Sequence, residues 1–173
     1  MTLTIRRGDE ADIPALQDLE RDAAQAFRSI GYDFCADGPV RTYDEHQRDL
    51  QTGAVFVAEV DGQLAGFILM WPVDGRAHIT EVSVAERYQQ LGIGRSLVST
   101  GERWAQEQGY SEITLTTFRD VSWNAPFYAS LGYQIFTPDS ERTELAAVRA
   151  EEIESGFHAK PRVAMKKQLL GIL

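Results

Sequence analysis

The stretch "ERYQQLGIGRSLVSTGERWAQEQGY", from Glu86 to Tyr110, is the part of the sequence that predicts the fold. After its two glycines, Gly92 and Gly94, apolar residues recur at the spacing of an amphipathic helix, and Gly109 stands where a C-terminal cap is expected. Glycine near the start of a helix costs about 1 kcal/mol relative to alanine. Two explanations are open for glycine at these positions: close packing of the helix on a sheet, or a bound phosphate.

Two β-rich runs flank this stretch. "AHITEVSV" (77–84) precedes it, and "SEITLTTF" (111–118) follows it. Strand, glycine turn, helix and strand together make a βαβ unit. At the turn, unpaired N–H groups and the positive end of the helix dipole meet, so the sequence predicts an anion site there.

Two common phosphate-binding motifs do not fit the turn. A P-loop ends in Gly-Lys-Ser/Thr, whereas Gly94 is followed here by Arg95-Ser96. The dinucleotide fingerprint needs a third glycine where this chain has Leu97. A nucleotide-binding βαβ domain is therefore disfavoured.

The rest of the chain alternates short strands and helices. The hairpin signal is Asp61-Gly62 between two β-rich runs, and Asn124 with Pro126 predicts the capped start of a short helix. The expected strands are 3–8, 54–60, 63–73, 133–136 and 162–169, the expected helices are 9–27, 40–53, 124–132 and 141–156, and a loop is expected at 31–38.

Composition limits the classes of function. The 173 residues carry a formal net charge of -9, which argues against nucleic acid or an anionic membrane surface as a partner and suits a cationic or amine-bearing one. Cys35 is the only cysteine, and no apolar run is long enough to span a bilayer. We expect one domain, residues 1–173, in the cytoplasm.

Two motifs carry a resemblance to a known family. The pattern Gln89-x-x-Gly92-x-Gly94, between a strand and a helix, resembles the acyl-coenzyme A signature of the GNAT N-acetyltransferases. "FYASLGY" (127–133), after the following strand, resembles the second signature of that superfamily. The segment "TLTTFRDVSWNAPFYASLGY" with "RVAMKK" near the end is similar to a bacterial subgroup whose substrates are undefined.

The resemblance implies an α+β fold. Its central sheet would be mixed and mostly antiparallel, with about six to seven strands flanked by helices. It also implies that strands four and five splay apart, so that the thioester and the amine meet between them.

The resemblance further implies how acetyl-coenzyme A binds. Main-chain groups of Val82 and Val84 would pair with the pantetheine arm, and Asn124 would lie near the sulfur. The family's frequent asparagine falls here on Val121, so capping a helix remains an equal alternative for Asn124. The backbone expected to cradle the pyrophosphate is that of Gln89, Gln90, Leu91, Gly92, Ile93, Gly94 and Arg95.

Acetyl transfer to an amine requires a base for the ammonium and an acid for the departing thiolate. Tyr128 is the candidate acid, because a phenol is protonated at neutral pH. Glu81, in the strand before the turn, is the first candidate base, and His78 competes with it. A core tyrosine, an exposed strand carboxylate and a hydrogen-bonded histidine are the structural alternatives.

Other polar residues give weaker signals. The resemblance also implies that the first helix and the segment after it line the acceptor end of the site, through Glu20, Phe27, Arg28 and Tyr32, although an ordinary amphipathic surface explains these residues equally well. Cys35 and His46 lack a nucleophile motif. The histidines at 46, 78 and 158 lack ligand spacing, so we expect no metal.

Two classes of function remain. The first is an N-acetyltransferase that moves an acetyl group from acetyl-coenzyme A to a primary amine of a small molecule or peptide, by direct attack in a ternary complex. The second is a non-catalytic acyl-coenzyme A sensor or interaction module. Tyr128 favours the enzyme, and assembly into a homodimer stays open.

Overall fold

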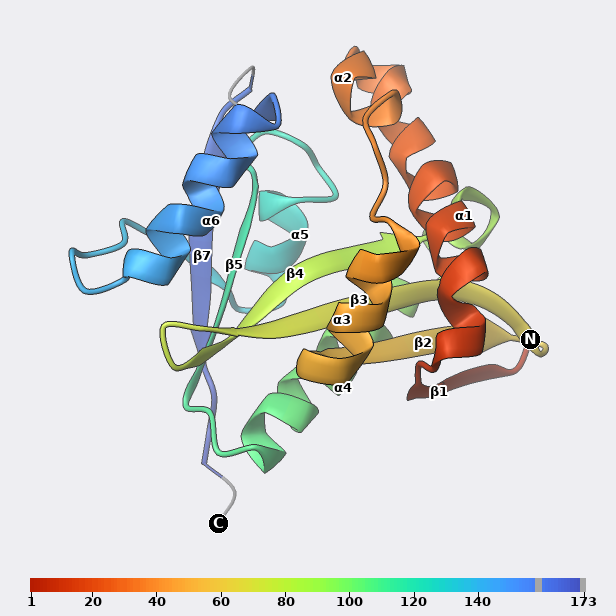
Figure 1. The fold of residues 1–173 in the computed structure, drawn as a ribbon, viewed down its shortest axis with the longest axis horizontal. Helices are drawn as coiled ribbons and strands as arrows, with labels where there is room; N and C mark the ends of the chain where they lie inside the picture. Colours follow the sequence, from red (N-terminus) through yellow and green to blue (C-terminus); the bar gives the residue numbers. More distant parts are fainter. Residues whose placement is uncertain (158–159, 172–173) are drawn as a thin grey trace. The chain divides into compact units, whose positions relative to one another are not determined.

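The computed structural model describes residues 1–157 and 160–171 and contains a seven-stranded mixed sheet in the order β1-β2-β3-β4-β5-β7-β6 (Figure 1). The predicted α+β class, with a sheet of six to seven strands flanked by helices, is confirmed. The chain divides into two compact units. The first comprises residues 1–71 and 81–101, and the second comprises residues 72–80 and the chain from 102 onward. The prediction of a single domain stays a prediction.

The first unit begins with three antiparallel strands. β1 (Leu3–Arg7) pairs with β2 (Ala54–Val60), which pairs with β3 (Gln63–Val73). Asp61 and Gly62 turn the hairpin with φ angles of 50° and 81°. Two positive φ angles define a type I′ turn, the hairpin predicted from this dipeptide.

Helical segments connect β1 to β2. They are η1 (Glu10–Asp12), α1 (Ile13–Ala24), η2 (Gln25–Ile30), α2 (Asp33–Ala36) and α3 (Tyr43–Thr52). The predicted loop at 31–38 is therefore wrong in part, because α2 lies inside it. Cys35 N donates to Tyr32 O at 2.9 Å and Asp37 N to Asp33 O at 2.8 Å, which closes one helical turn.

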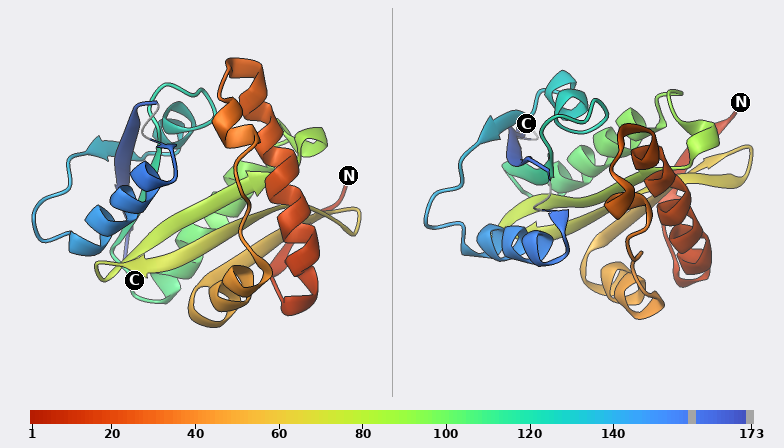
Figure 2. Two further views of the ribbon diagram at one scale, coloured as in Figure 1. Left: turned by 45° about the horizontal axis from the view of Figure 1, so that its top comes forward. Right: turned by 90° about the horizontal axis from the view of Figure 1, so that it is seen from above.

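A hydrophobic core fills the space between α1 and one face of the strands. It consists of Leu16, Leu19, Val55, Val57, Phe67, Leu69 and Ala85. On the other face, a Cβ added at Gly101 of α4 would lie 3.0 Å from Ile68 and 3.1 Å from Met70. Helices α1 and α3 thus cover one face of β2 and β3, and α4 covers the other (Figure 2).

The predicted βαβ unit is present. β4 (Arg76–Val84) leads through η3 (Glu86–Tyr88) into α4 (Ile93–Glu107), and β5 (Glu112–Phe118) follows. Residues 77–79 of β4 pair in parallel with residues 113–115 of β5. The expected parting of the two strands beyond this point stays a prediction.

In the second unit, β7 lies between β5 and β6. β7 (Arg162–Gln168) is antiparallel to β5 and to β6 (Gln134–Phe136). α6 (Thr143–Glu154) packs on one face of these strands through Leu145, and α5 (Ala125–Ser130) precedes β6. In the described part of the chain, no helix is both long and apolar enough to cross a bilayer.

Candidate active site

The glycine loop before α4 has an unusual backbone. Gln90 and Gly92 have φ angles of 62° and 81°. A Cβ added at Gly92 would meet nothing within 4 Å, so close packing does not explain this glycine. Its left-handed conformation does, since glycine adopts it without strain. The helix predicted to follow the glycine turn is α4, which begins at Ile93, directly after these two residues.

The N-terminus of α4 can accept an anion. The first helical hydrogen bond runs from Ser96 N to Gly92 O at 3.1 Å. By helix geometry, the N–H groups of Ile93, Gly94 and Arg95 therefore lack an intrahelical acceptor. The loop from Gln90 to Gly92 is exposed, so a diphosphate could reach these amides.

The end of β4 lies directly before this loop. Ala85 N donates to Ala65 O at 2.9 Å, and the Gln89 side-chain amide donates to Val84 O at 3.1 Å. Val82 and Val84 are half-buried. Residues 81–84 of β4 and the glycine loop thus follow one another within the first unit.

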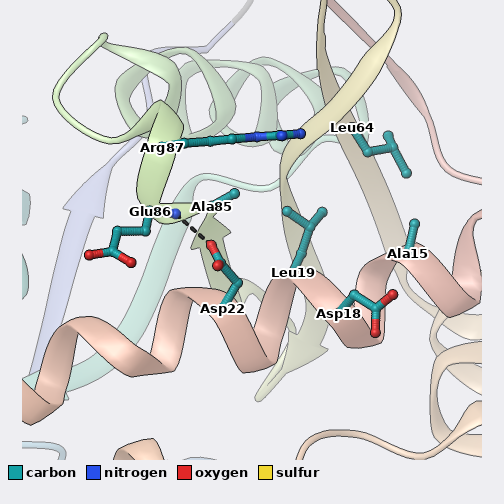
Figure 3. A pocket seen from close by; sticks show the side chains of 8 residues that line it. All are labelled: Ala15, Asp18, Leu19, Asp22, Leu64, Ala85, Glu86 and Arg87. Atoms are coloured by element: carbon teal, nitrogen blue, oxygen red, sulfur yellow. Dashed lines mark hydrogen bonds between the residues drawn. The ribbon is translucent and has the colours of Figure 1, made fainter.

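A separate hollow of about 380 Å³ lies between α1 and the chain after β4 (Figure 3). Its carboxylates are Asp18, Asp22 and Glu86, and Asp22 Oδ2 accepts from Glu86 N at 2.6 Å. The other lining residues are Ala15, Leu19, Leu64, Ala85 and Arg87. Three carboxylates beside one guanidinium disfavour phosphate, so this hollow is not a second phosphate cradle.

The two candidate bases have different surroundings. Glu81 is half-buried, and its Oε1 accepts from Ser83 Oγ at 2.7 Å. His78 is 2% exposed, with Nδ1 2.8 Å from Thr114 Oγ1. Burial lowers the pKa of His78 to about 4, although the carboxylates of Glu152 and Asp74 oppose the shift. His78 is therefore neutral at physiological pH.

Tyr128 lies on α5, 9% exposed, within a row of aromatic rings. Its ring centroid is 5.1 Å from that of Phe127 and 5.7 Å from that of Tyr133. Asn124 occupies the N-cap position of α5, but its side chain does not cap the helix. Its Oδ1 instead accepts from Thr117 Oγ1 of β5 at 2.8 Å, so the capping role expected for this side chain is wrong.

Three of the four acceptor candidates lie on the segment after α1. The rings of Phe27 and Tyr32 stack at 6.2 Å, and that of Phe34 follows at 5.7 Å from Tyr32. Arg28 points to carboxylates of the same segment, with Nη2 2.7 Å from Asp37 Oδ1. The structure thus groups the aromatic rings and pairs the guanidinium locally.

Glu20 belongs to a buried polar network. Its Oε2 accepts from Arg41 N at 2.9 Å, and its Oε1 lies 2.9 Å from His46 Nε2. Asp49, 1% exposed, accepts two bonds of 2.7 Å from the Arg41 guanidinium and one of 3.0 Å from Trp71 Nε1. Sequence reasoning missed this network. His46 lies within it, and His158 lies outside the described residues.

Residues 14–133 match the acetyltransferase (GNAT) family, and this chain belongs to it. Among curated proteins, it is 33% identical over 85 residues to N-acetyltransferase family 8 member 3 of Rattus norvegicus. That match covers 46% of this chain and 37% of the relative's length.

Two solved structures show the same fold at low identity. The ribosomal-protein-S18-alanine N-acetyltransferase from Escherichia coli has a TM-score of 0.71 and 17% identity, with 99% of this chain and 96% of that one covered. The PaiA N-acetyltransferase from Thermoplasma acidophilum, in complex with coenzyme A, has a TM-score of 0.70 and 16% identity, with 97% and 99% covered.

Proposed function

We propose that this chain transfers an acetyl group from acetyl-coenzyme A to a primary amine of a small molecule or peptide. The observation that carries the proposal is the glycine loop, which opens the N-terminus of α4 to an anion in a member of the GNAT family. The coenzyme A bound to the Thermoplasma protein of the same fold supports the same ligand here.

We place the coenzyme along the first unit. The pyrophosphate would accept hydrogen bonds from the backbone between Gln89 and Arg95, and the pantetheine arm would pair with Val82 and Val84. Asn124 stays a candidate contact. Because its Oδ1 already accepts from Thr117, a coenzyme contact there would use its amide nitrogen.

The chemistry needs three proton transfers. A base takes one proton from the acceptor ammonium, the amine nitrogen attacks the thioester carbon, and the carbon–sulfur bond breaks as an acid protonates the thiolate. The attacking nitrogen then loses a second proton, which restores the acid, and an amide and a free thiol remain. We assign the base to Glu81 ahead of His78, because Glu81 is half-buried and oriented by Ser83, whereas His78 is almost fully buried. Tyr128 would protonate the departing thiolate. The attack would occur directly, with coenzyme and amine bound together.

For the acceptor, we favour Phe27 and Tyr32 over Glu20 and Arg28. The first two offer stacked rings, whereas the charged groups of the last two contact other residues of the same unit. The net charge of -9 suits an amine. We also infer that the chain belongs to the bacterial subgroup with the "TLTTFRDVSWNAPFY" segment and acts in the cytoplasm, which its single cysteine supports.

Thiol release from acetyl-coenzyme A tests this function. Purified protein would be assayed against polyamines, amino acids, aminoglycosides and peptides with free N-termini, with coenzyme affinity measured by calorimetry. We expect at least one amine to raise turnover well above hydrolysis. Tight coenzyme binding without turnover on any acceptor would instead favour the sensor. Absence of binding would contradict both.

A further inference from the structure

The end of α5 ties Tyr133 to Tyr128. Gly132, with a φ angle of 93°, lets Gly132 N donate to Ala129 O and Tyr133 N donate to Tyr128 O, both at 3.1 Å. This pair of bonds defines a Schellman motif. In such a motif, the two residues joined by the longer hydrogen bond, here Tyr133 and Tyr128, commonly make a side-chain contact as well. Here that contact is the ring pair of Tyr128 and Tyr133, at 5.7 Å and 73°. Any movement of Tyr133 therefore reaches Tyr128.

An ion pair holds the other end of Tyr133. Its hydroxyl donates to Glu102 Oε1 at 3.0 Å, and Lys167 Nζ lies 3.0 Å from each oxygen of that carboxylate. Lys167 Nζ also lies 5.6 Å from the centre of the Tyr133 ring. The three side chains come from α4, the segment after α5, and β7. We name Tyr133, Glu102 and Lys167 the Tyr133 clasp.

The clasp is largely withdrawn from water. Tyr133 is 3% exposed, and the side chains of Glu102 and Lys167 are 18% and 29% exposed. Burial, and then the charge of Glu102, raise the pKa of Tyr133. Tyr133 is therefore a neutral phenol at physiological pH and a permanent donor to Glu102.

The need to fill space in the core does not explain the hydroxyl and the two charged groups of the clasp. Ion pairs shielded from water pay a desolvation cost, and apolar side chains of similar volume often stabilise a protein as well or better. The clasp fixes the orientation of the Tyr133 side chain, because the Tyr133 hydroxyl and the Lys167 ammonium both bind the Glu102 carboxylate. Rigid placement is what a catalytic group requires.

We propose that the Tyr133 clasp is a positioning device for Tyr128. The inference rests on the proposed function, in which the hydroxyl of Tyr128 protonates the thiolate. The Tyr128 ring contacts the rings of both Phe127 and Tyr133, and the clasp fixes Tyr133. Without the clasp, Tyr133 loses its anchor and the hydroxyl of Tyr128 loses its alignment.

The test is a double-mutant cycle. Tyr133→Phe and Glu102→Gln would each be made in the wild type and in Tyr128→Phe, with Glu107→Gln, an exposed change on α4, as the matched control. In the wild type, each clasp variant should lower kcat roughly tenfold and leave the KM for acetyl-coenzyme A unchanged. In Tyr128→Phe, the same changes should have little further effect. Lys167→Arg should retain most of the activity.

The outcomes separate this inference from the proposed function. Equal losses in both backgrounds, or unchanged kcat in the clasp variants, would overturn the positioning role while Tyr128 kept its own. If Tyr128→Phe alone retained full kcat, Tyr128 would not be the proton donor, and the clasp would have no catalytic role to support. If Tyr133→Phe fails to fold, Glu102→Gln and Lys167→Arg carry the test.

Discussion

At the residue scale, Gln90 and Gly92 bring the chain into α4 through two left-handed backbone conformations. Any other residue at 92 is strained by the backbone, although its side chain would have room. Gly94 is different, because it lies within α4 and is not among the residues with positive φ. Substitutions at Gly94 therefore test whether the coenzyme phosphates bind here, with less effect on the backbone of the loop.

We expect Gly94→Glu to abolish coenzyme binding. Acetyl-coenzyme A should bind the wild type with roughly micromolar affinity, about -8 kcal/mol. A carboxylate at the N-terminus of α4 would occupy and repel the phosphate position. Calorimetry should show loss of binding in folded Gly94→Glu and a smaller loss in Gly94→Ala. Unchanged affinity in Gly94→Glu would place the phosphates elsewhere.

His78 should make stability depend on pH in a defined window. Its pKa is lowered from 6.5 to about 4 in the folded state, so the unfolded chain binds more protons between these values. Stability is then complete above pH 6.5 and falls as the pH drops towards 4, by about 2 kcal/mol between 6.5 and 5. Urea unfolding of wild type and His78→Gln at several pH values checks this. The free energy of unfolding should fall less in the variant than in the wild type as the pH drops. An equal dependence of the free energy of unfolding on pH in both proteins would mean that His78 is not held neutral in the folded state.

At the element scale, the network of Arg41, His46 and Asp49 joins the start of α3 to α1 and β3. Thr42 caps α3, accepting from Glu45 N, while Glu45 accepts from Thr42 N. Through Glu20 and Trp71, the network reaches the two neighbouring elements. It thereby holds the segment between α2 and α3 in place.

Asp49→Ala should destabilise the protein by about 3 kcal/mol, because it leaves the Arg41 guanidinium and the Trp71 N–H without their acceptor. Asp18→Ala is the matched control, since Asp18 pairs with Arg21 at an exposed site and its loss should barely change the Tm. Thermal unfolding measures both. Equal effects in the two variants would show that burial adds nothing to the Asp49 pair.

Local signals in the sequence predicted much of this architecture. Asp61-Gly62 fixed the hairpin, and the glycines with helical spacing after them predicted the βαβ unit, because these signals act within a few residues. The short helix α2 was missed, since one helical turn has no periodicity to read. The Tyr133 clasp was also missed, because Glu102 and Lys167 are 65 positions apart and only the folded sheet brings them together.

At the scale of the whole molecule, a net charge of -9 should favour multivalent cationic acceptors. Salt screens this attraction, with a Debye length of about 10 Å at 0.1 M and about 3 Å at 1 M. We expect the KM of a polyamine to rise several-fold over this range and that of a singly charged amine to change little. Steady-state kinetics at several salt concentrations check this. A KM that is independent of salt for both would exclude long-range attraction as a source of acceptor preference.

We propose that Tyr128 protonates the thiolate in an acetyl transfer carried out by this chain. Kinetics of wild type and Tyr128→Phe test this role directly, because the variant keeps the ring that contacts Phe127 and Tyr133 and removes only the hydroxyl. We predict that kcat falls roughly 10²- to 10⁴-fold, towards the low end because a thiolate is a good leaving group, while acetyl-coenzyme A binds as before. A variant with wild-type kcat on a good amine acceptor would contradict the account.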